Sequence, residues 1–581
     1  MKAAQLRPVG VAIALLASLV TAIAVSSPTA EAAMPDPSQW DPGYIVSDAQ
    51  FYDANAMTEA EIQAFLEARV PVCETWRSEG PSDPIVCLKD YRMNTQNMTV
   101  DQFCPVPYVG ATNERASTII YKVAQACGIS PKVILVTLDK ETSLVSHTWP
   151  SQWRYTRAMG YGCPDTAPCI EAYGGLQKQI YLAAKQMKRY QANPQNYNYR
   201  AGRWNNIAYN PKAACGYSAV YIQNVATASL YNYTPYQPTS TALANNSNSD
   251  GCSSYGNRNF WRYWWNWFGD PTTGIPAGIT VDRVGGNDRY DVAVAISQKF
   301  YPSGASTVYI ATGDNFPDAL SAAPAAARAE GPLLLVPGKS LPASIAAELT
   351  RLTPTSIVVI GGPASVSDAV VTQLAPYATT VTRVSGSDRY EVSRNITRNA
   401  FADTGSDIAY IATGVGFPDA LSASAAAGSL DAPVILVYGP QATLDAATAA
   451  LLVELGVEEV RIAGGPASVS AGIETALRGV SGVTSVTRFG GNDRFQVSGA
   501  INRDVFSSAT TVFVANGMNF PDALSGAAVA GAINAPLYVI PGHCMPNFVA
   551  NDIVNFGATK MHILGGAASV TSDVGIFKRC R

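Results

Sequence analysis

Glu141 occupies an unusual position for an ionisable side chain. Ser130 and Pro131 are typical of the start of a helix, and the apolar pattern continues to about Val145. Glu141 follows Leu138 by three residues and precedes Val145 by four, so it shares the apolar face of this helix. A carboxylate there needs either a polar partner or an opening to a cleft. In a cleft it could act as the general acid that protonates a glycosidic oxygen.

Two interpretations of Glu141 follow from this position. In the first, Glu141 is the acid and base of glycan cleavage; in the second, it is a structural carboxylate paired with an Arg or a Tyr. Other hydrolytic chemistries lack the residues they need. A serine or cysteine nucleophile needs a histidine as base, and only His147 lies in this half. The 10 Cys form an even number and the 3 His are scattered, so we expect no metal site and no cofactor.

The segment from Ile129 to Ser143 resembles the lysozyme-like fold of lytic transglycosylases, in which a helix ends with a catalytic Glu followed by a small hydroxyl residue. Further segments loosely resemble the Gly, Gln and aromatic positions that line the sugar cleft of that family; they are 160–162, 173–177 and 226–236. The Gly-Leu-Met-Gln segment usual in the family is absent from this chain.

This resemblance implies a mainly α, lysozyme-like domain that cleaves peptidoglycan strands. Glu141 would protonate the glycosidic oxygen, and would then help the 6-hydroxyl of the sugar attack C1 and release an anhydro product. Tyr161, Gln177 and Tyr233 would position the glycan. The alternative is that the aromatic rings only fill the core. The chain would then be a non-enzymatic surface or adhesion protein that displays a degenerate lysozyme-like domain.

The elements that position these residues belong to the first of two unlike halves. All 9 Trp precede residue 270, and the chain beyond it is rich in Ala, Val, Gly and Ser. A Pro- and Gly-containing segment, 271–278, separates the halves and is typical of a linker. A chain of 581 residues has room for several domains of roughly 100–200 residues.

Three short motifs recur in the second half, in the same order, three times. Gly-x-Asp-Arg-aromatic begins at residues 286, 386 and 491; Phe-Pro-Asp-Ala-Leu-Ser begins at 316, 417 and 520; Gly-Gly followed by small residues begins at 361, 464 and 565. The Asp-Arg pairs, which begin at 288, 388 and 493, are therefore spaced by 100 and 105 residues. This period is that of a small domain rather than of a solenoid unit.

Within one repeat, apolar runs alternate with helical patterns. The predicted strands are 307–311, 333–336 and 356–360, and the predicted helices begin at Pro317, Ser344 and Ser365. Continuous apolar strands separated by helices predict an α/β fold with a doubly wound, mostly parallel sheet. The Gly-Gly pairs fit tight turns, because no repeat has the Gly-x-Gly-x-x-Gly pattern of a dinucleotide site.

These motifs resemble the type 2 cell-wall-binding repeat of Gram-positive surface proteins, over residues 279–581. The resemblance implies three modules in a pseudo-threefold arrangement that bind an anionic wall polymer. The family also has a Pro followed by aliphatic residues in its second strand, a segment implicated in polymer binding. The corresponding candidates here are Leu334, Ile435 and Tyr538, and Tyr538 departs from the aliphatic pattern.

Arg289, Arg389 and Arg494 are the charged candidates for the same polymer. Exposed guanidinium groups and loop N–H groups can bind phosphate, and tethered sites gain avidity on the order of 10²–10⁴-fold. The alternative is that each Arg pairs with the adjacent carboxylate or with one from a neighbouring module.

The N-terminus and the cysteines indicate export. An apolar stretch from Val9 to Val25 precedes Ala30-Glu31-Ala32, which fits a secretion signal cleaved near residue 32; an uncleaved membrane anchor is the alternative. We expect disulfides in an exported chain, with Cys163–Cys169 and Cys544–Cys580 as the first candidates. After signal cleavage no membrane association is expected.

The sequence therefore predicts a secreted protein held non-covalently at the cell wall or cell surface. Its predicted parts are a signal peptide (1–32), an aromatic- and Cys-rich domain (33–270), the linker, and repeats at 279–380, 381–484 and 485–581. The expected partners are an anionic wall polymer and peptidoglycan. Nucleic acid is not an expected partner, because the net charge is −4 and no basic run occurs.

Overall fold

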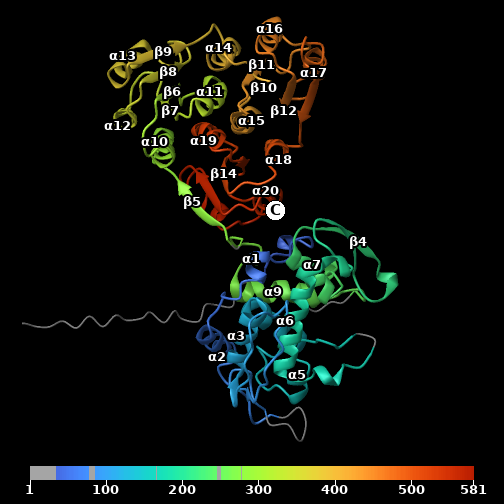
Figure 1. The fold of residues 1–581 in the computed structure, drawn as a ribbon. Helices are drawn as coiled ribbons and strands as arrows, with labels where there is room; N and C mark the ends of the chain where they lie inside the picture. The colour runs from blue at the N-terminus through green and yellow to red at the C-terminus, as the bar shows by residue number, and fades with distance from the viewer. Residues whose placement is uncertain (1–34, 78–84, 165–166, 245–249, 277, 581) are drawn as a thin grey trace, which may run out of the picture.

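The computed structural model describes residues 35–77, 85–164, 167–244, 250–276 and 278–580. The predicted signal peptide lies outside the described residues. Within these ranges, every helix is too short or too polar to cross a bilayer. Figure 1 shows a mainly helical N-terminal part and, beyond it, three α/β modules.

The N-terminal part consists of helices, loops and two short antiparallel strand pairs. Its helices are α1 (Asp48–Phe51), α2 (Glu59–Arg69), α3 (Ala116–Cys127), α4 (Pro131–Thr142), α5 (Gln152–Thr156), α6 (Leu176–Ala192), α7 (Val225–Tyr233), α8 (Ser240–Ala244) and α9 (Gly256–Phe268). Its strand pairs are β1 (Arg92–Met93) with β2 (Glu114–Arg115), and β3 (Arg203–Ala208) with β4 (Tyr217–Ile222).

Helix α4, which carries Glu141, forms the centre of the N-terminal core. Its residues 133–139 are all buried, and α9 packs against it. Phe260, Trp261 and Trp264 on α9 are buried, so this aromatic helix closes the domain. The end of the helix that bears Glu141 is therefore fixed by packing.

Disulfides brace the loops of both parts. Among the described residues no cysteine is free, and the pairs are Cys73–Cys87, Cys104–Cys127, Cys163–Cys169, Cys215–Cys252 and Cys544–Cys580. The expectation of disulfides is confirmed, and both pairs favoured from spacing are among them. Such cross-links stabilise a fold mainly by restricting the unfolded chain.

Each module contains a four-stranded parallel sheet. The strand orders are β7-β6-β8-β9, β11-β10-β12-β13 and β15-β14-β16-β5. The strands are β5 (Thr280–Val284), β6 (Thr307–Thr312), β7 (Leu333–Val336), β8 (Ser356–Ile360), β9 (Thr380–Val384), β10 (Ile408–Thr413), β11 (Val434–Val437), β12 (Glu459–Ala463), β13 (Ser485–Phe489), β14 (Thr511–Asn516), β15 (Leu537–Ile540) and β16 (Lys560–Leu564).

Helices connect these strands. They are α10 (Arg289–Phe300), α11 (Pro317–Arg328), α12 (Ala343–Leu352), α13 (Asp368–Leu374), α14 (Arg389–Phe401), α15 (Pro418–Ser429), α16 (Ala446–Glu454), α17 (Ala471–Leu477), α18 (Arg494–Val505), α19 (Pro521–Ala532), α20 (Asn547–Asn555) and α21 (Ser572–Gly575). In the first module the chain moves from β6 out to β7 and then back past β6 to β8. Because such crossovers are right-handed, the reversal puts α11 and α12 on opposite faces of the sheet.

The fourth strand of each sheet comes from the start of the following repeat. Strand β9 pairs with β8, and β13 pairs with β12, although β9 and β13 begin the second and third repeats. The first repeat supplies β5 to the last sheet, where Val284 lies opposite Leu564. The three modules therefore form a closed ring, joined by a strand from about 280 residues earlier in the chain.

Helices α11, α15 and α19 pack against one another at the centre of this ring (Figure 1). Their approach depends on small residues. A Cβ atom on Gly428 would lie 2.9 Å from the Cβ of Ala327 and 3.0 Å from the Cα of Gly531. At the other end, the rings of Phe316, Phe417 and Phe520 contact one another with centroids 5.6–5.8 Å apart.

The C-terminal tail contacts the N-terminal part. Arg579 donates through Nε to the hydroxyl of Tyr44 at 3.2 Å, and its guanidinium lies over the Tyr44 ring at 4.8 Å. Gly274 N–H donates to the carbonyl of Ile576 at 2.8 Å. Burial raises the pKa of Tyr44. The disulfide at Cys580 holds this tail, so the last module supports the contact with the N-terminal part.

Candidate functional sites

Glu141 lies at the C-terminal end of α4, where it has both a charged partner and a partly exposed carboxylate. Its side chain is 28% exposed, and its Oε1 atom lies 2.8 Å from the Nζ of Lys140. The partner is therefore a neighbouring Lys rather than an Arg or a Tyr. Its Oε2 atom faces Gly160, where a Cβ would lie only 2.8 Å away and φ is +68°. Only glycine leaves room for the carboxylate here.

Lys140 is the fixed member of this pair. Its side chain is 1% exposed, its Nζ donates to the Thr234 hydroxyl at 2.8 Å, and it lies over the ring of Tyr233 at 5.6 Å. A buried ammonium needs an anionic partner. Lys140 therefore orients the carboxylate of Glu141 while one side of that carboxylate stays open to solvent.

Tyr233 and Tyr161 lie near Glu141. The Tyr233 hydroxyl donates to the carbonyl of Met159 at 2.7 Å. Burial, reinforced by the negative charge of Glu141, raises the pKa of Tyr233 well above its usual value. The Tyr161 ring lies 5.3 Å from that of Tyr173 and is partly exposed. These rings give the surroundings of Glu141 an aromatic surface.

Gln177 does not have the predicted position. It is 3% exposed, its Oε1 accepts from the N–H of Gln96 at 3.0 Å, and its Nε2 donates to the Gln96 carbonyl at 2.7 Å. Both ends of the amide are therefore used to hold a loop. The prediction that Gln177 contacts the glycan is wrong, because its hydrogen-bonding groups face the protein interior.

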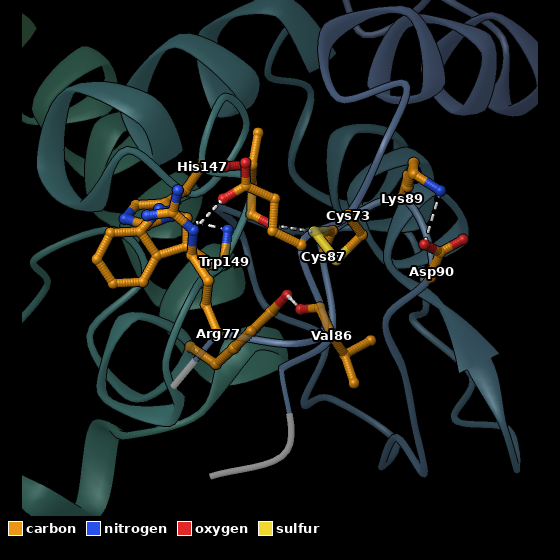
Figure 2. The surroundings of a disulfide bond; sticks show 11 residues. Cys73, Arg77, Val86, Cys87, Lys89, Asp90, His147 and Trp149 are labelled. Atoms are coloured by element: carbon orange, nitrogen blue, oxygen red, sulfur yellow. Dashed lines mark hydrogen bonds and ion pairs between the residues drawn. A yellow bond between two sulfur atoms is a disulfide. The ribbon is translucent and has the colours of Figure 1, made fainter. Parts of the chain in front are cut away.

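A disulfide supports the loop that follows Glu141. Figure 2 shows Cys73 bonded to Cys87, next to the segment that carries His147 and Trp149. The carbonyl of Thr148 accepts the N–H of Glu74 at 2.7 Å, and Arg77 lies over the Trp149 ring at 5.4 Å. This cross-link fixes the chain directly after the candidate catalytic residue. His147 contributes to this packing, since its Nδ1 accepts the N–H of Trp149 at 3.1 Å.

The three repeat arginines surround the phenylalanine ring contacts at the pseudo-threefold centre. Each guanidinium lies over a Phe of the preceding module: Arg289 over Phe520 at 5.6 Å, Arg389 over Phe316 at 5.8 Å, and Arg494 over Phe417 at 5.7 Å. Such cation–π contacts join neighbouring modules. Each Arg also donates Nη1 to a backbone carbonyl at a strand end, of Gly313, Gly414 and Gly517 respectively.

The carboxylates near these arginines have two separate roles. The Asp that precedes each Arg accepts N–H groups at the start of its own helix, as Asp288 does from Tyr290 and Asp291 at 2.9 Å. It is a helix N-cap. The Asp of the Phe-Pro-Asp motif instead lies within electrostatic reach of the neighbouring module's Arg. Each repeat Arg therefore has a carboxylate of a neighbouring module within electrostatic reach, which is part of the alternative predicted from the sequence. This arrangement does not exclude polymer binding.

These three motif carboxylates should make the repeat half less stable as pH rises. Burial raises the pKa of Asp318, Asp419 and Asp522 above 3.8. A carboxyl group whose pKa is higher in the folded state stabilises the fold at pH values below its pKa in the unfolded chain. This stabilisation is lost as pH rises through the pKa of the folded state. Replacing all three with Asn should therefore flatten the pH dependence of the unfolding free energy, measured by urea denaturation. The exposed control Asp403→Asn should leave it unchanged, and parallel curves for wild type and triple variant would contradict the prediction.

The three second-strand residues that were predicted to contact the polymer lie in the core. Leu334 in β7, Ile435 in β11 and Tyr538 in β15 are each 0% exposed. The Tyr538 hydroxyl donates to Asp552 at 3.1 Å, which accounts for its departure from the aliphatic pattern. The prediction that these three side chains contact the polymer is wrong, because they have no accessible surface. They lie in the strands that pair with β6, β10 and β14, at whose ends the arginines donate.

A second set of structurally important arginines was not identified from the sequence. Arg283, Arg383 and Arg488 donate to the carbonyls of Gly565, Gly361 and Gly464 respectively, each the first glycine of a Gly-Gly pair. These glycines have φ values of +97° to +107°, so the turns are tight, as predicted. The signal was present as an Arg two or three residues before each repeat's first glycine. These arginines fasten the fourth strand of each sheet.

Comparisons with known proteins agree with this architecture. Residues 283–371, 383–474 and 488–575 match the family described as cell wall binding domain 2. Residues 44–273 match the family described as the N-terminal domain of LasA. Two relatives come from Bacillus subtilis (strain 168). The N-acetylmuramoyl-L-alanine amidase LytC is 27% identical over 51% of this chain and 58% of its own length, and the amidase enhancer is 28% identical over 52% and 40%. The chain thus spans about half the length of these relatives.

Two solved structures are similar over a comparable share of the chain. Cwp6 from Clostridium difficile is 26% identical, with a TM-score of 0.48, over 52% of this chain and 48% of its own. Cwp8 from the same organism is 28% identical, with a TM-score of 0.47, over 52% and 51%.

The second half of this protein is a cell-wall-binding region. Three cell wall binding domain 2 repeats occupy residues 283–575. These repeats indicate a location at the cell wall or cell surface. The N-terminal part is helical and is similar to the family described as the N-terminal domain of LasA, whereas its lysozyme-like fold is a proposal.

Proposed function

We propose that the three repeats hold this protein non-covalently on an anionic wall polymer, through Arg289, Arg389 and Arg494. The observation that carries the proposal is the placement of three equivalent guanidinium groups around one centre. Each guanidinium has five N–H donors and uses one of them for a hydrogen bond to a strand-end carbonyl. The remaining donors suit phosphate or carboxylate groups spaced along a polymer.

Sedimentation with purified wall sacculi tests this proposal. The full chain should pellet with intact sacculi and stay in solution after acid extraction has removed their anionic secondary polymers. Raised salt should reduce pelleting, because exposed charge pairs are screened. Equal pelleting with stripped sacculi would point to peptidoglycan as the ligand and would refute an anionic secondary polymer.

A second function is cleavage of glycan strands by Glu141. It is favoured because the Glu141 carboxylate is held by Lys140 and is still partly exposed to solvent. The lysozyme-like resemblance assigns Glu141 the acid and base steps, and Tyr161 and Tyr233 would position the glycan. Lys140 would hold the carboxylate in place. Proton donation then requires that a bound glycan exclude water and weaken that pairing.

Release of soluble muropeptides from sacculi checks this second function. Wild type should release anhydro-sugar products, and Glu141→Gln should lower the rate by about 10²-fold or more, since general acid–base catalysis contributes 10²–10⁴-fold. Glu171→Gln, an exposed carboxyl change in the same part, is the matched control and should retain the wild-type rate. Equal rates for wild type and Glu141→Gln would leave the display of a degenerate domain as the function of this part.

A further inference from the structure

The β3–β4 hairpin presents an aromatic face that none of the described elements covers. Its inward residues, such as Ile207 and Ile222, are 0% exposed, whereas its outward aromatic residues face solvent. Trp204 is 68% exposed, Tyr217 64% and Tyr221 43%. Aromatic side chains gain much from burial, so three exposed rings on one small sheet indicate a surface for a partner.

The strand register sets the spacing of these rings. Trp204 lies directly opposite Tyr221, with ring centroids 5.7 Å apart, and Tyr217 lies opposite Ala208. Tyr217 and Tyr221 are four residues apart on one strand, which separates them by about 14 Å at ~3.4 Å per residue. The outward residues between the two ends, Asn206 and Ala219, are small. The face is therefore a shallow strip that fits an extended polymer made of ring-shaped units.

The charge of this segment identifies the class of partner. Residues 199–224 contain Arg200, Arg203 and Lys212 but no Asp or Glu, although the whole chain has a net charge of −4. A basic segment with exposed rings is complementary to an anionic polymer. The repeats place the chain among wall glycans, which favours a polysaccharide over a nucleic acid.

The hairpin is also held rigidly, as a binding platform requires. Gln237 donates through Nε2 to the Ile207 carbonyl and to the Ser218 hydroxyl, both at 2.7 Å. The Cys215–Cys252 disulfide anchors the loop that joins the two strands. Rings presented on a braced sheet lose little conformational freedom when a ligand binds.

We propose that the outward face of the β3–β4 hairpin binds an anionic polysaccharide strand, with sugar rings stacked on Trp204, Tyr221 and Tyr217. This site is separate from the repeat arginines and from Glu141. It gives the N-terminal part its own contact with wall glycan. Two linked contacts on one polymer network would bind more tightly than either alone.

Affinity electrophoresis of the full chain tests the proposal, with polygalacturonate as the anionic probe and a neutral β-glucan as its uncharged counterpart. The double variant Trp204→Ala/Tyr221→Ala should weaken polygalacturonate binding at least about tenfold, as loss of central aromatic anchors does at other interfaces. Trp76→Ala removes an equally exposed Trp, 71% exposed, from elsewhere in the same part and should bind as wild type does. Circular dichroism must show both variants folded.

Three results would overturn the proposal: equal binding by wild type and the double variant, equal or tighter binding of the neutral glucan, and tighter binding of a single-stranded oligonucleotide. A tyrosine series gives a second measurement should the double variant fail to fold. Tyr217→Phe should bind nearly as wild type, and Tyr217→Ala should bind more weakly, because stacking needs only the ring. Failure of the repeat proposal would appear separately, as loss of sacculus sedimentation with hairpin binding intact.

Discussion

Replacing Arg289, Arg389 and Arg494 with Gln one at a time should weaken sacculus binding in successive steps, and the triple variant should lose about 10²–10⁴-fold in apparent affinity. The reason is multivalency: each repeat adds a tethered contact to the same polymer. Gln retains a donor for the strand-end carbonyl but not the positive charge. The measurement is a sedimentation isotherm against sacculi at fixed ionic strength.

The control for this series lies on the same helix as Arg389. Arg398 pairs with Glu454 at 2.8 Å on the outer surface, so Arg398→Gln removes an equal charge away from the centre. It should bind sacculi nearly as wild type does. Because each guanidinium also lies over a Phe, thermal unfolding of every variant is needed. A folded triple variant with wild-type affinity would refute the role of these arginines.

Replacing Val284 with Asp should lower the free energy of unfolding of the repeat half by about 3 kcal/mol or more, because it buries an unpaired charge. Val284 is 4% exposed in β5 and lies opposite Leu564 in β16. It is part of the strand that closes the ring. Urea denaturation of the full chain measures the loss. Val453→Asp, at a position 51% exposed on α16, should change stability little.

Proteolysis separates ring closure from general destabilisation. Loss of β5 pairing should expose residues 271–285 to limited trypsin digestion, with Arg283 as the new cleavage site. Val384→Asp makes the same change at the equivalent position of β9, and should leave Arg283 protected. Cleavage at Arg283 in both variants, or in neither, would contradict a special role for the closing strand.

Short-range sequence patterns were enough to predict three strands and three helices of the first repeat, although its third helix, α13, begins at Asp368 rather than at the predicted Ser365. The predicted strand 333–336 matches β7 (Leu333–Val336), and the helix predicted from Ser344 matches α12 (Ala343–Leu352). These predictions depend on apolar runs and turn residues within a few positions of one another. The helix that carries Glu141 was predicted for the same reason, from its N-terminal Ser-Pro and its apolar face.

The predictions for side chains were less accurate. The aliphatic strand residues were expected to contact polymer, yet strands covered on both faces leave them no surface. Gln177 was expected in a sugar cleft, but helix α6 turns it inward to hold the Gln96 backbone. Periodicity identifies the apolar face of an element, but it does not show which polar residue will be enclosed by a loop from elsewhere in the chain.

The sequence by itself determined that this protein has three α/β repeats after an aromatic-rich, disulfide-containing half, because repeated motifs and hydrophobic periods are local properties. Only the tertiary structure decided that β5 completes the last sheet, that each Arg lies over a Phe of another module, and that Tyr233 and Thr234 enclose Lys140 beside Glu141. Each of these contacts depends on how the chain folds back on itself. Such folding is set by the packing of whole elements rather than by the residues next to each contact.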